Sequence, residues 1–170
     1  MTRTGGVAAS ILLAALAACS SKVTLVGHEK LATAMPAVES WTRETPSGAE
    51  IKLPAPASHV SAGYTRGASR IDLEITDTGG AKAYLEAVST VAGTSFAQGN
   101  ASGYTKGTTF HGSPALESWN NGDRTSDLTV IVAKRYLIHA AGSNLDRIET
   151  LRDFVGKVGG GQTLFPQFSR

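Results

Sequence analysis

The chain's only cysteine, Cys19, stands directly after an apolar N-terminal run, and this placement limits how the rest of the chain can fold. Arg3 gives the run a positive start, and the residues from Val7 to Ala18 are apolar except for Ser10. This is the layout of a secretory signal peptide, which is removed and takes no part in the fold. With no second cysteine for a disulfide, the exported domain must be stabilised by packing alone.

The end of the run carries a more specific pattern. Leu16, Ala17, Ala18 and Cys19 resemble the lipobox of bacterial lipoproteins. The resemblance implies cleavage between Ala18 and Cys19 and attachment of a diacylglycerol to the cysteine sulfur. Small residues before the cysteine suit a narrow peptidase cleft, and a thiolate is a better nucleophile for lipid transfer than a hydroxyl. The expected functional residues are therefore the lipidated Cys19 and the three lipobox residues before it.

Two other interpretations of this run compete with the lipobox. A transmembrane helix needs about 20 apolar residues, whereas this run has about a dozen. The second interpretation is an ordinary secretory signal peptide. The lipoprotein resemblance also bears on location, because Ser20 stands where an aspartate would retain a Gram-negative lipoprotein in the inner membrane. The expected location is the bacterial cell envelope, at the outer membrane facing the periplasm in a Gram-negative cell, or outside the plasma membrane in a Gram-positive one.

Length and charge predict one domain after the signal. The chain has 16 basic and 14 acidic side chains and no basic stripe, which argues against nucleic acid as a partner. The expected partners are the membrane, through the lipid on Cys19, and an envelope protein. The expected segments are a signal peptide over 1–18, a lipidated tether over 19–27, a single α+β domain over 28–158 and a C-terminal tail over 159–170.

Alternation of apolar and polar side chains predicts most of the strands. Ile71, Leu73 and Ile75 alternate with Asp72 and Glu74, which indicates a strand with one buried face and one face in water. Residues 127–133 are apolar on both faces, which is typical of a central strand. Extended segments are expected over 41–45, 50–53, 60–65, 70–76, 104–110, 115–119, 127–133 and 136–141. A turn is expected over 46–48 and a loop over 94–103.

Helical spacing of apolar residues predicts two main helices, over 81–91 and 145–158, and a short one over 29–34. Helices and strands of these lengths must share one core. The expected fold class is α+β, with an antiparallel sheet of about six to seven strands and the two main helices packed on it.

The order of these elements over residues 60–158 loosely resembles the PsbP-like fold, which implies an accessory or binding role more than catalysis. Stretches such as 34–36, 40–43, 71–77 and 115–119 also resemble small uncharacterised bacterial lipoproteins. That second resemblance implies no activity.

The four histidines do not predict a metal site. His28, His59, His111 and His139 show no ligand spacing such as H-x-H or H-E-x-x-H. His139 lies in a predicted strand and is interpreted as a residue of the sheet surface or core. His111 lies in a loop and is interpreted as a turn residue, although it could touch a ligand.

The acidic residues do not form a catalytic pattern either. Asp72 and Glu74 share the wet face of one strand, and Asp123 and Asp127 flank a predicted hairpin with too few oxygen ligands for calcium. The serines lack the G-x-S-x-G elbow of many hydrolases. We therefore expect no catalytic residues.

Neither a phosphate loop nor an aromatic pocket is strongly indicated. Residues 79–80 are a glycine pair between a strand and a helix, but they lack the complete patterns of nucleotide-binding loops, so no cofactor is expected. Aromatic side chains at such spacing belong to a core more often than to a pocket. Those considered are Trp41, Trp119, Tyr64, Tyr104 and Tyr136.

The function predicted from the sequence is a lipid-anchored, non-enzymatic binding or accessory module of the envelope. One alternative is a small-ligand or lipid-binding carrier in the periplasm, which a large apolar cavity between sheet and helices would favour. A second alternative is an enzyme of unrecognised type, which would need an acid, a base and a nucleophile in one pocket.

Overall fold

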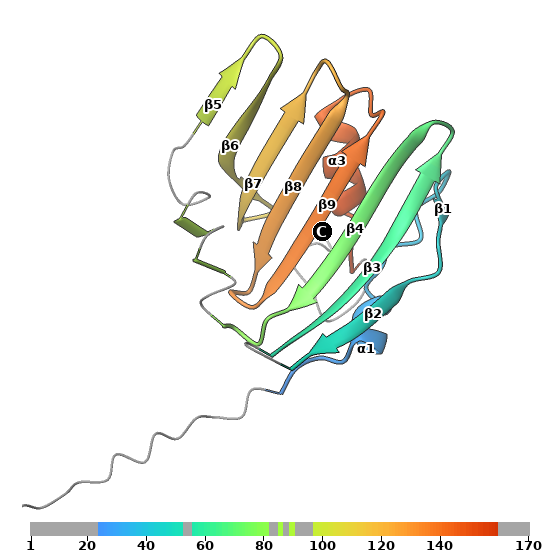
Figure 1. The fold of residues 1–170 in the computed structure, drawn as a ribbon, viewed down its shortest axis with the longest axis vertical. Coiled ribbons are helices and arrows are strands. Elements are labelled where there is room, and N and C mark those ends of the chain that lie inside the picture. The colour runs from blue at the N-terminus through green and yellow to red at the C-terminus, as the bar shows by residue number, and fades with distance from the viewer. Residues whose placement is uncertain (1–23, 53–55, 82–84, 87–88, 91–96, 160–170) are drawn as a thin grey trace, which may run out of the picture.

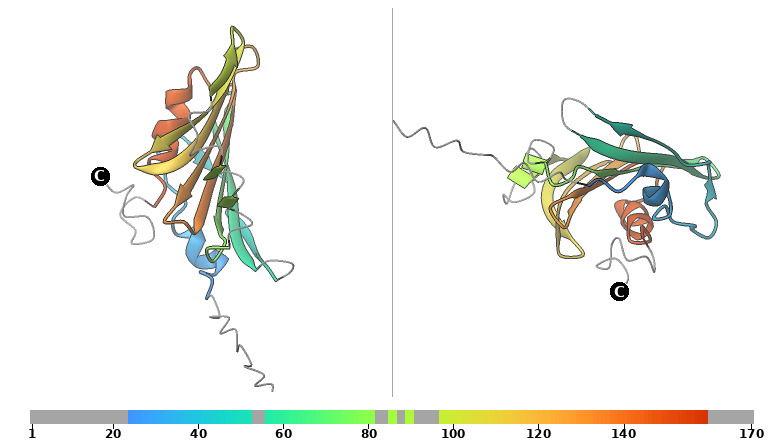
Figure 2. Two further views of the ribbon diagram at one scale, coloured as in Figure 1. Left: turned by 90° about the vertical axis from the view of Figure 1, so that its left-hand side faces the viewer. Right: turned by 90° about the horizontal axis from the view of Figure 1, so that it is seen from below.

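A single curved antiparallel sheet dominates the computed structural model, which describes residues 24–52, 56–81, 85–86, 89–90 and 97–159. The sheet has nine strands, more than the six to seven expected (Figure 1). Two helices, α1 and α3, lie in its concave side (Figure 2). The fold is therefore α+β in the broad sense, with strands as its main component.

The elements have the following bounds. The helices are α1 (His28–Ala32) and α3 (Ile148–Val155). The strands are β1 (Thr42–Arg43), β2 (Ser47–Ile51), β3 (Ala57–Arg66), β4 (Ser69–Asp77), β5 (Ala97–Asn100), β6 (Gly103–Phe110), β7 (Ser113–Asn120), β8 (Thr125–Val132) and β9 (Tyr136–Ser143).

The strand order is β1-β3-β4-β9-β8-β7-β6-β5, and β2 also pairs with β3. Strands β5 to β9 form a meander in which each strand pairs with the next. The last strand of the meander, β9, pairs with β4, and this pairing joins the meander to the β3–β4 hairpin. The prediction of a central strand over 127–133 is confirmed, because β8 lies between β7 and β9.

Alternation along the strands separates a packed face from a polar one. Ile71, Leu73 and Ile75 are at most 1% exposed and pack toward the helices. Asp72 and Glu74, between them on β4, are exposed on the opposite face, so the predicted wet face is confirmed. The helices add their own buried residues to this core: Leu31, Leu151, Phe154 and Val155.

Strand β5 was missed in the sequence, where residues 94–103 were expected to form a loop. Ala97–Asn100 has no β-branched or aromatic residue, so its own preference for a strand is weak. Its pairing with β6 through Gln98 and Thr105 holds it extended instead. β2 similarly begins at Ser47, inside the predicted turn, because it pairs with β3.

The last helix is shorter than predicted. It begins at Ile148, not at residue 145, because a tertiary contact holds Leu145 outside the helix. Leu145 donates its N–H to the Arg124 carbonyl, and the Arg124 guanidinium donates back to the Leu145 carbonyl at 3.0 Å. The Leu145 side chain is 1% exposed and covers Gly142. The segment is thus fixed to the β7–β8 hairpin before the helix can start.

Several predicted segments lie wholly or partly outside the described residues. These are the lipobox and Cys19, the C-terminal tail over 160–170, and most of the helix expected over 81–91. Residues 85–86 and 89–90 of that helix are described and are helical. Within the part of the chain that the structure describes, no helix has the length and hydropathy needed to cross a bilayer.

The N-terminal chain enters the domain through a buried ion pair, called here the entry clamp (Thr24, Val26, Asp77 and Arg135). Asp77 is fully buried and takes two hydrogen bonds from Arg135, at 2.7 and 2.6 Å. Its carboxylate also accepts the Val26 N–H at 2.7 Å, and Arg135 donates to the Thr24 carbonyl at 2.8 Å. Residues 24–27, expected to be free tether, are therefore fastened to the sheet.

A second buried carboxylate ties α3 to the sheet. Glu117 of β7 faces the helices, and its side chain is 0% exposed. It accepts hydrogen bonds from Arg152 of α3 at 2.5 Å and from the Tyr104 hydroxyl at 2.7 Å, and Lys106 lies 3.3 Å away. Burial raises the pKa of Glu117, but the bonds from Arg152 and Tyr104 outweigh it and hold the pKa below its usual value.

Candidate functional site

The candidate site lies on the sheet face opposite α1 and α3, called here the open face. Neither helix covers this face (Figure 2). The strand register places mostly short polar side chains on it, in rows that cross the sheet. One such row contains Gln98, Thr105, Ser118 and Asp127 from the four successive strands β5 to β8.

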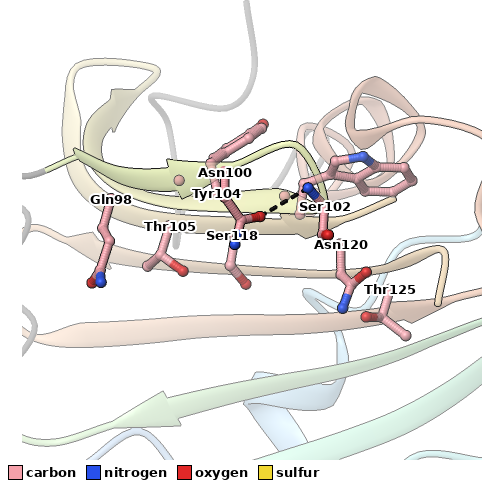
Figure 3. Close-up of a pocket in the computed structure, with 11 residues that line it drawn as sticks. Gln98, Asn100, Ser102, Tyr104, Thr105, Ser118, Asn120 and Thr125 are labelled. Carbon is pink, nitrogen blue, oxygen red and sulfur yellow. Dashed lines mark hydrogen bonds between the residues drawn. The ribbon is translucent and has the colours of Figure 1, made fainter. Parts of the chain in front are cut away.

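One end of the open face holds a cavity of about 460 Å³, called here the neutral pocket. It lies where β5 and β6 meet and extends over β7 and β8 (Figure 3). None of the described residues that line it is charged. Its polar side chains are Gln98, Asn100, Ser102, Thr105, Ser118, Asn120 and Thr125.

Some of these side chains hold the local turns and others do not. The side-chain oxygen of Asn120 accepts two backbone N–H groups of the β7–β8 turn. Its side-chain NH₂ group donates to Asp123 at 2.9 Å. The Asn100 oxygen accepts the Ser102 N–H at 2.8 Å (Figure 3). In contrast, Gln98, Thr105 and Thr125 make no side-chain hydrogen bond to any described residue. Among the described residues, therefore, none competes with a ligand for these three groups.

A glycine forms part of the pocket lining. A Cβ atom at Gly103 would overlap the Trp119 carbonyl oxygen of the neighbouring strand. Only a residue without a side chain fits here, so the backbones of β6 and β7 approach closely at this point. Part of the pocket lining is therefore backbone and not side chain.

The middle of the open face carries charges instead. A second cavity of about 390 Å³ is lined by Glu44, Arg70, Asp72, Glu74 and His139, among others. Arg70 lies between Glu44 at 2.7 Å and Asp72 at 2.6 Å. A side chain at Gly63 would overlap this group, so the glycine lets the ion pairs lie flat on the sheet.

His139 of β9 faces Asp127 of β8, with 3.5 Å between the Nε2 and Oδ1 atoms. The hydrogen bond to Asp127 raises the pKa of His139, and the nearby charge of Glu74 acts in the same direction against partial burial. The same hydrogen bond lowers the pKa of Asp127. The placement of His139 on the sheet surface agrees with one of the two positions expected from the sequence.

We expect an NMR titration to give a pKa for His139 above the free value of about 6.5, and Asp127→Asn to move it back toward that value. A raised pKa in the folded state means that protonated His139 adds stability at low pH. That stability is lost as the pH rises through the folded-state pKa. Asp123→Asn, at the nearby hairpin, is the matched control and is expected to leave the titration unchanged. An unaltered His139 pKa in Asp127→Asn would contradict the assignment.

The same group does not have the order of a hydrolase triad. The Ser118 hydroxyl donates to Asp127 at 3.3 Å, so the carboxylate lies between the serine and the histidine. Activation of a serine requires the imidazole to contact the hydroxyl and the acid to lie behind it. This arrangement therefore gives no nucleophile.

The four histidines lie on different elements, although His28 and the His59 backbone both approach Gly48 of β2. His28 is on α1 against β2, His59 is on β3, and His111 is in the β6–β7 turn with a φ of 47°. Within the described ranges, no group of three or more His, Cys, Asp or Glu residues is arranged to hold a metal ion. Asp123 and Asp127 also serve different partners, Asn120 and His139.

The glycine pair and the aromatic residues have structural surroundings. The Gly79 and Gly80 N–H groups donate to the Asp77 and Thr78 side chains, so they are not directed at a phosphate. Tyr64 is fully buried and its ring meets Phe154 of α3 edge-to-face at 4.7 Å. Trp41 and Trp119 are partly buried against the same core.

A third cavity, of about 490 Å³, is more apolar. Leu85, Pro114 and Ile131 line it at the end of the open face nearer the entry clamp. Ile131 is 3% exposed although its register places it on the open face, and it lines this hollow together with Leu85.

Of the residues that line the neutral pocket, Tyr104 and Trp119 were considered from the sequence as possible pocket aromatics, but its polar residues were not. Gln98 and Asn100 lay in a predicted loop, and Thr105 and Thr125 carried no motif, so only the strand pairing brings them together. Comparison with protein-family models, curated proteins and solved structures finds no significant match to this chain.

Proposed function

We propose that this protein is a lipid-anchored binding module of the bacterial cell envelope and that the open face is its binding surface. One observation carries the binding role: the neutral pocket contains side chains whose hydrogen-bonding groups have no described partner. Gln98, Thr105 and Thr125 are the three. The helix side of the sheet is, in contrast, filled by the apolar core.

Two features support a lipid anchor: the lipobox resemblance and the short distance between Cys19 and the folded domain. Cys19 precedes Thr24, the first residue of the entry clamp, by only a few positions. Even fully extended, five residues span about 17 Å. A diacylglycerol on Cys19 carries two acyl chains, which is already enough for stable anchoring, and an amide-linked acyl group would add a third.

We expect Cys19→Ser to abolish lipidation and processing and to release the protein from washed membranes. Mass spectrometry of the N-terminal peptide measures the lipid, and fractionation of cells measures the location. Ser20→Ala is the matched control, because it changes the neighbouring residue and keeps the thiol. Membrane association of Cys19→Ser equal to that of the parent protein would show that the anchor is not the one proposed.

A small-ligand carrier is the second candidate, and the apolar hollow beside Leu85 and Ile131 favours it. The hollow lies on the open face, however, whereas the carrier hypothesis places its cavity between sheet and helices, a space that the apolar core fills. Native mass spectrometry of the purified protein separates the two candidates. A lipid or other apolar molecule that co-purifies in constant proportion would favour the carrier.

A further inference from the structure

We propose that the neutral pocket binds an uncharged, polyhydroxylated ligand, a segment of a saccharide chain. This inference rests on the proposed function, because it names the ligand class for the same open face. It does not depend on the lipid anchor, which is tested separately.

The absence of charge among the described lining residues selects against ionic ligands. A charged group placed in this pocket would lose part of its hydration without meeting an opposite charge. The nearest acidic groups already have partners, since Asp123 accepts the Asn120 amide and Asp127 accepts the Ser118 hydroxyl. The charged cavity around Arg70, farther along the same face, offers ionic ligands a better site.

The available groups match hydroxyls in particular. Amide and hydroxyl side chains offer both donors and acceptors, and a sugar hydroxyl also needs both kinds of partner. Gln98 supplies an amide from β5, while Thr105 and Thr125 supply hydroxyls from β6 and β8 (Figure 3). Neighbouring strands lie about 4.8 Å apart, which is close to the length of one pyranose unit. Gln98 and Thr105, on the neighbouring strands β5 and β6, can therefore meet successive units of a chain, and Thr125 on β8 can meet a unit farther along.

Pocket size and shape agree with a short segment of such a chain. The volume of about 460 Å³ is within the usual range of small-molecule sites. Because Gly103 has no side chain, backbone forms part of the pocket lining at this point.

An extended peptide is the competing ligand class, because β5 is the last strand of the described sheet and could pair with an added strand. Such a ligand also needs pockets for alternate side chains. On the open-face side of the neutral pocket, the largest aliphatic groups are threonine methyls. The register places Tyr104 and Trp119 on the helix side instead. The lining therefore favours a saccharide.

Calorimetric titration of the full lipidated protein tests the proposal, in a detergent without a sugar head group. The probes are maltohexaose, chitohexaose, an acidic hyaluronan hexasaccharide and an uncharged extended peptide. We expect at least one neutral oligosaccharide to bind with a dissociation constant below about 1 mM. Because no ion pair is involved, the affinity is expected to stay within about twofold between 0.05 and 0.5 M salt.

Variants locate the binding. Gln98→Leu and Thr125→Val remove one hydrogen-bonding group each with little change of shape, and each is expected to weaken binding about fivefold. Thr129→Val is the matched control on the same face outside the pocket and is expected to change the affinity less than twofold. Side-chain amide signals of Gln98 and Asn100 in NMR spectra give a second readout, and they are expected to shift on titration.

Three results would overturn the inference. One is that neither neutral oligosaccharide binds at about 10 mM. Another is binding that Thr129→Val weakens as much as Gln98→Leu does. The third is peptide binding that shifts the β5 backbone amides while the sugars have no effect, which would assign the edge strand to a protein partner. Each can occur with Cys19 fully lipidated, so a failed ligand assignment is distinguishable from a failed anchor.

Discussion

Arg135→Met is expected to lower the free energy of unfolding by about 3 kcal/mol, the lower end of the cost of breaking a buried ion pair. The substitution leaves the Asp77 carboxylate fully buried without its counter-ion. It also releases the Thr24 carbonyl from the Arg135 guanidinium. The expected cost is at the lower end because the Arg135 side chain is itself 31% exposed. Urea denaturation at neutral pH measures the change.

The pH dependence gives a second signature of the same pair. Burial raises the pKa of Asp77, but hydrogen bonds from Arg135 and the Val26 N–H hold it below the usual value. This carboxylate therefore adds stability above the unfolded-state pKa of about 3.9, and that stability is lost as the pH falls through the folded-state pKa. In Arg135→Met only the Val26 and Gly79 N–H groups still oppose the effect of burial, so the pKa of Asp77 is expected to rise and the stability difference between the variant and the parent protein to shrink as the pH falls.

Arg70→Ala is the control for these measurements. Arg70 also pairs with two carboxylates, but all three side chains are exposed, at 40% or more. Exposed ion pairs contribute little to stability. The variant is expected to unfold at nearly the same urea concentration as the parent protein. If Arg135→Met behaved like Arg70→Ala, the entry clamp would have no special part in stability.

The second large effect is expected at Glu117, where the two partners of one ion pair should respond differently. Arg152→Met leaves a fully buried carboxylate with only Lys106 and Tyr104, and it is expected to cost about 2 kcal/mol. Glu117→Met removes the buried charge itself, while Arg152 and Lys106 can turn toward water. That substitution is expected to be nearly neutral.

Hydrogen exchange of α3 separates this effect from a general loss of stability. Because Arg152 is the ion-pair link from α3 to β7, its replacement is expected to speed exchange of the α3 amides more than that of the β9 amides. An equal loss of stability in Arg152→Met and Glu117→Met would contradict the asymmetry. It would mean that the pair itself, and not an uncompensated buried charge, sets the cost.

The parts of the fold that were predictable are those in which side-chain alternation reports burial directly. β4 shows this most clearly, with Ile71, Leu73 and Ile75 inside and Asp72 and Glu74 outside. The two apolar faces of β8 likewise predicted its place between two other strands. In both strands the local pattern and the tertiary packing agree, so a single sequence carries the information.

The parts that were not predictable depend on contacts between residues far apart in the chain. β5 has weak strand preference and exists through its pairing with β6. The start of α3 is delayed by the contact of Leu145 with Arg124, which no local pattern reveals. The neutral pocket is a third case, because Gln98 and Thr125 become neighbours only once β5 to β8 are assembled.

The entry clamp has a consequence for how the protein stands on a membrane. The clamp fastens the chain at the end of the sheet where α1 lies, and the β5–β6 hairpin is at the opposite end (Figure 1). Strand β6, with eight residues, spans about 26 Å between these ends. With a lipid on Cys19, the strands would act as a rigid stalk, and the neutral pocket would be held at a set height above the bilayer, clear of the lipid head groups.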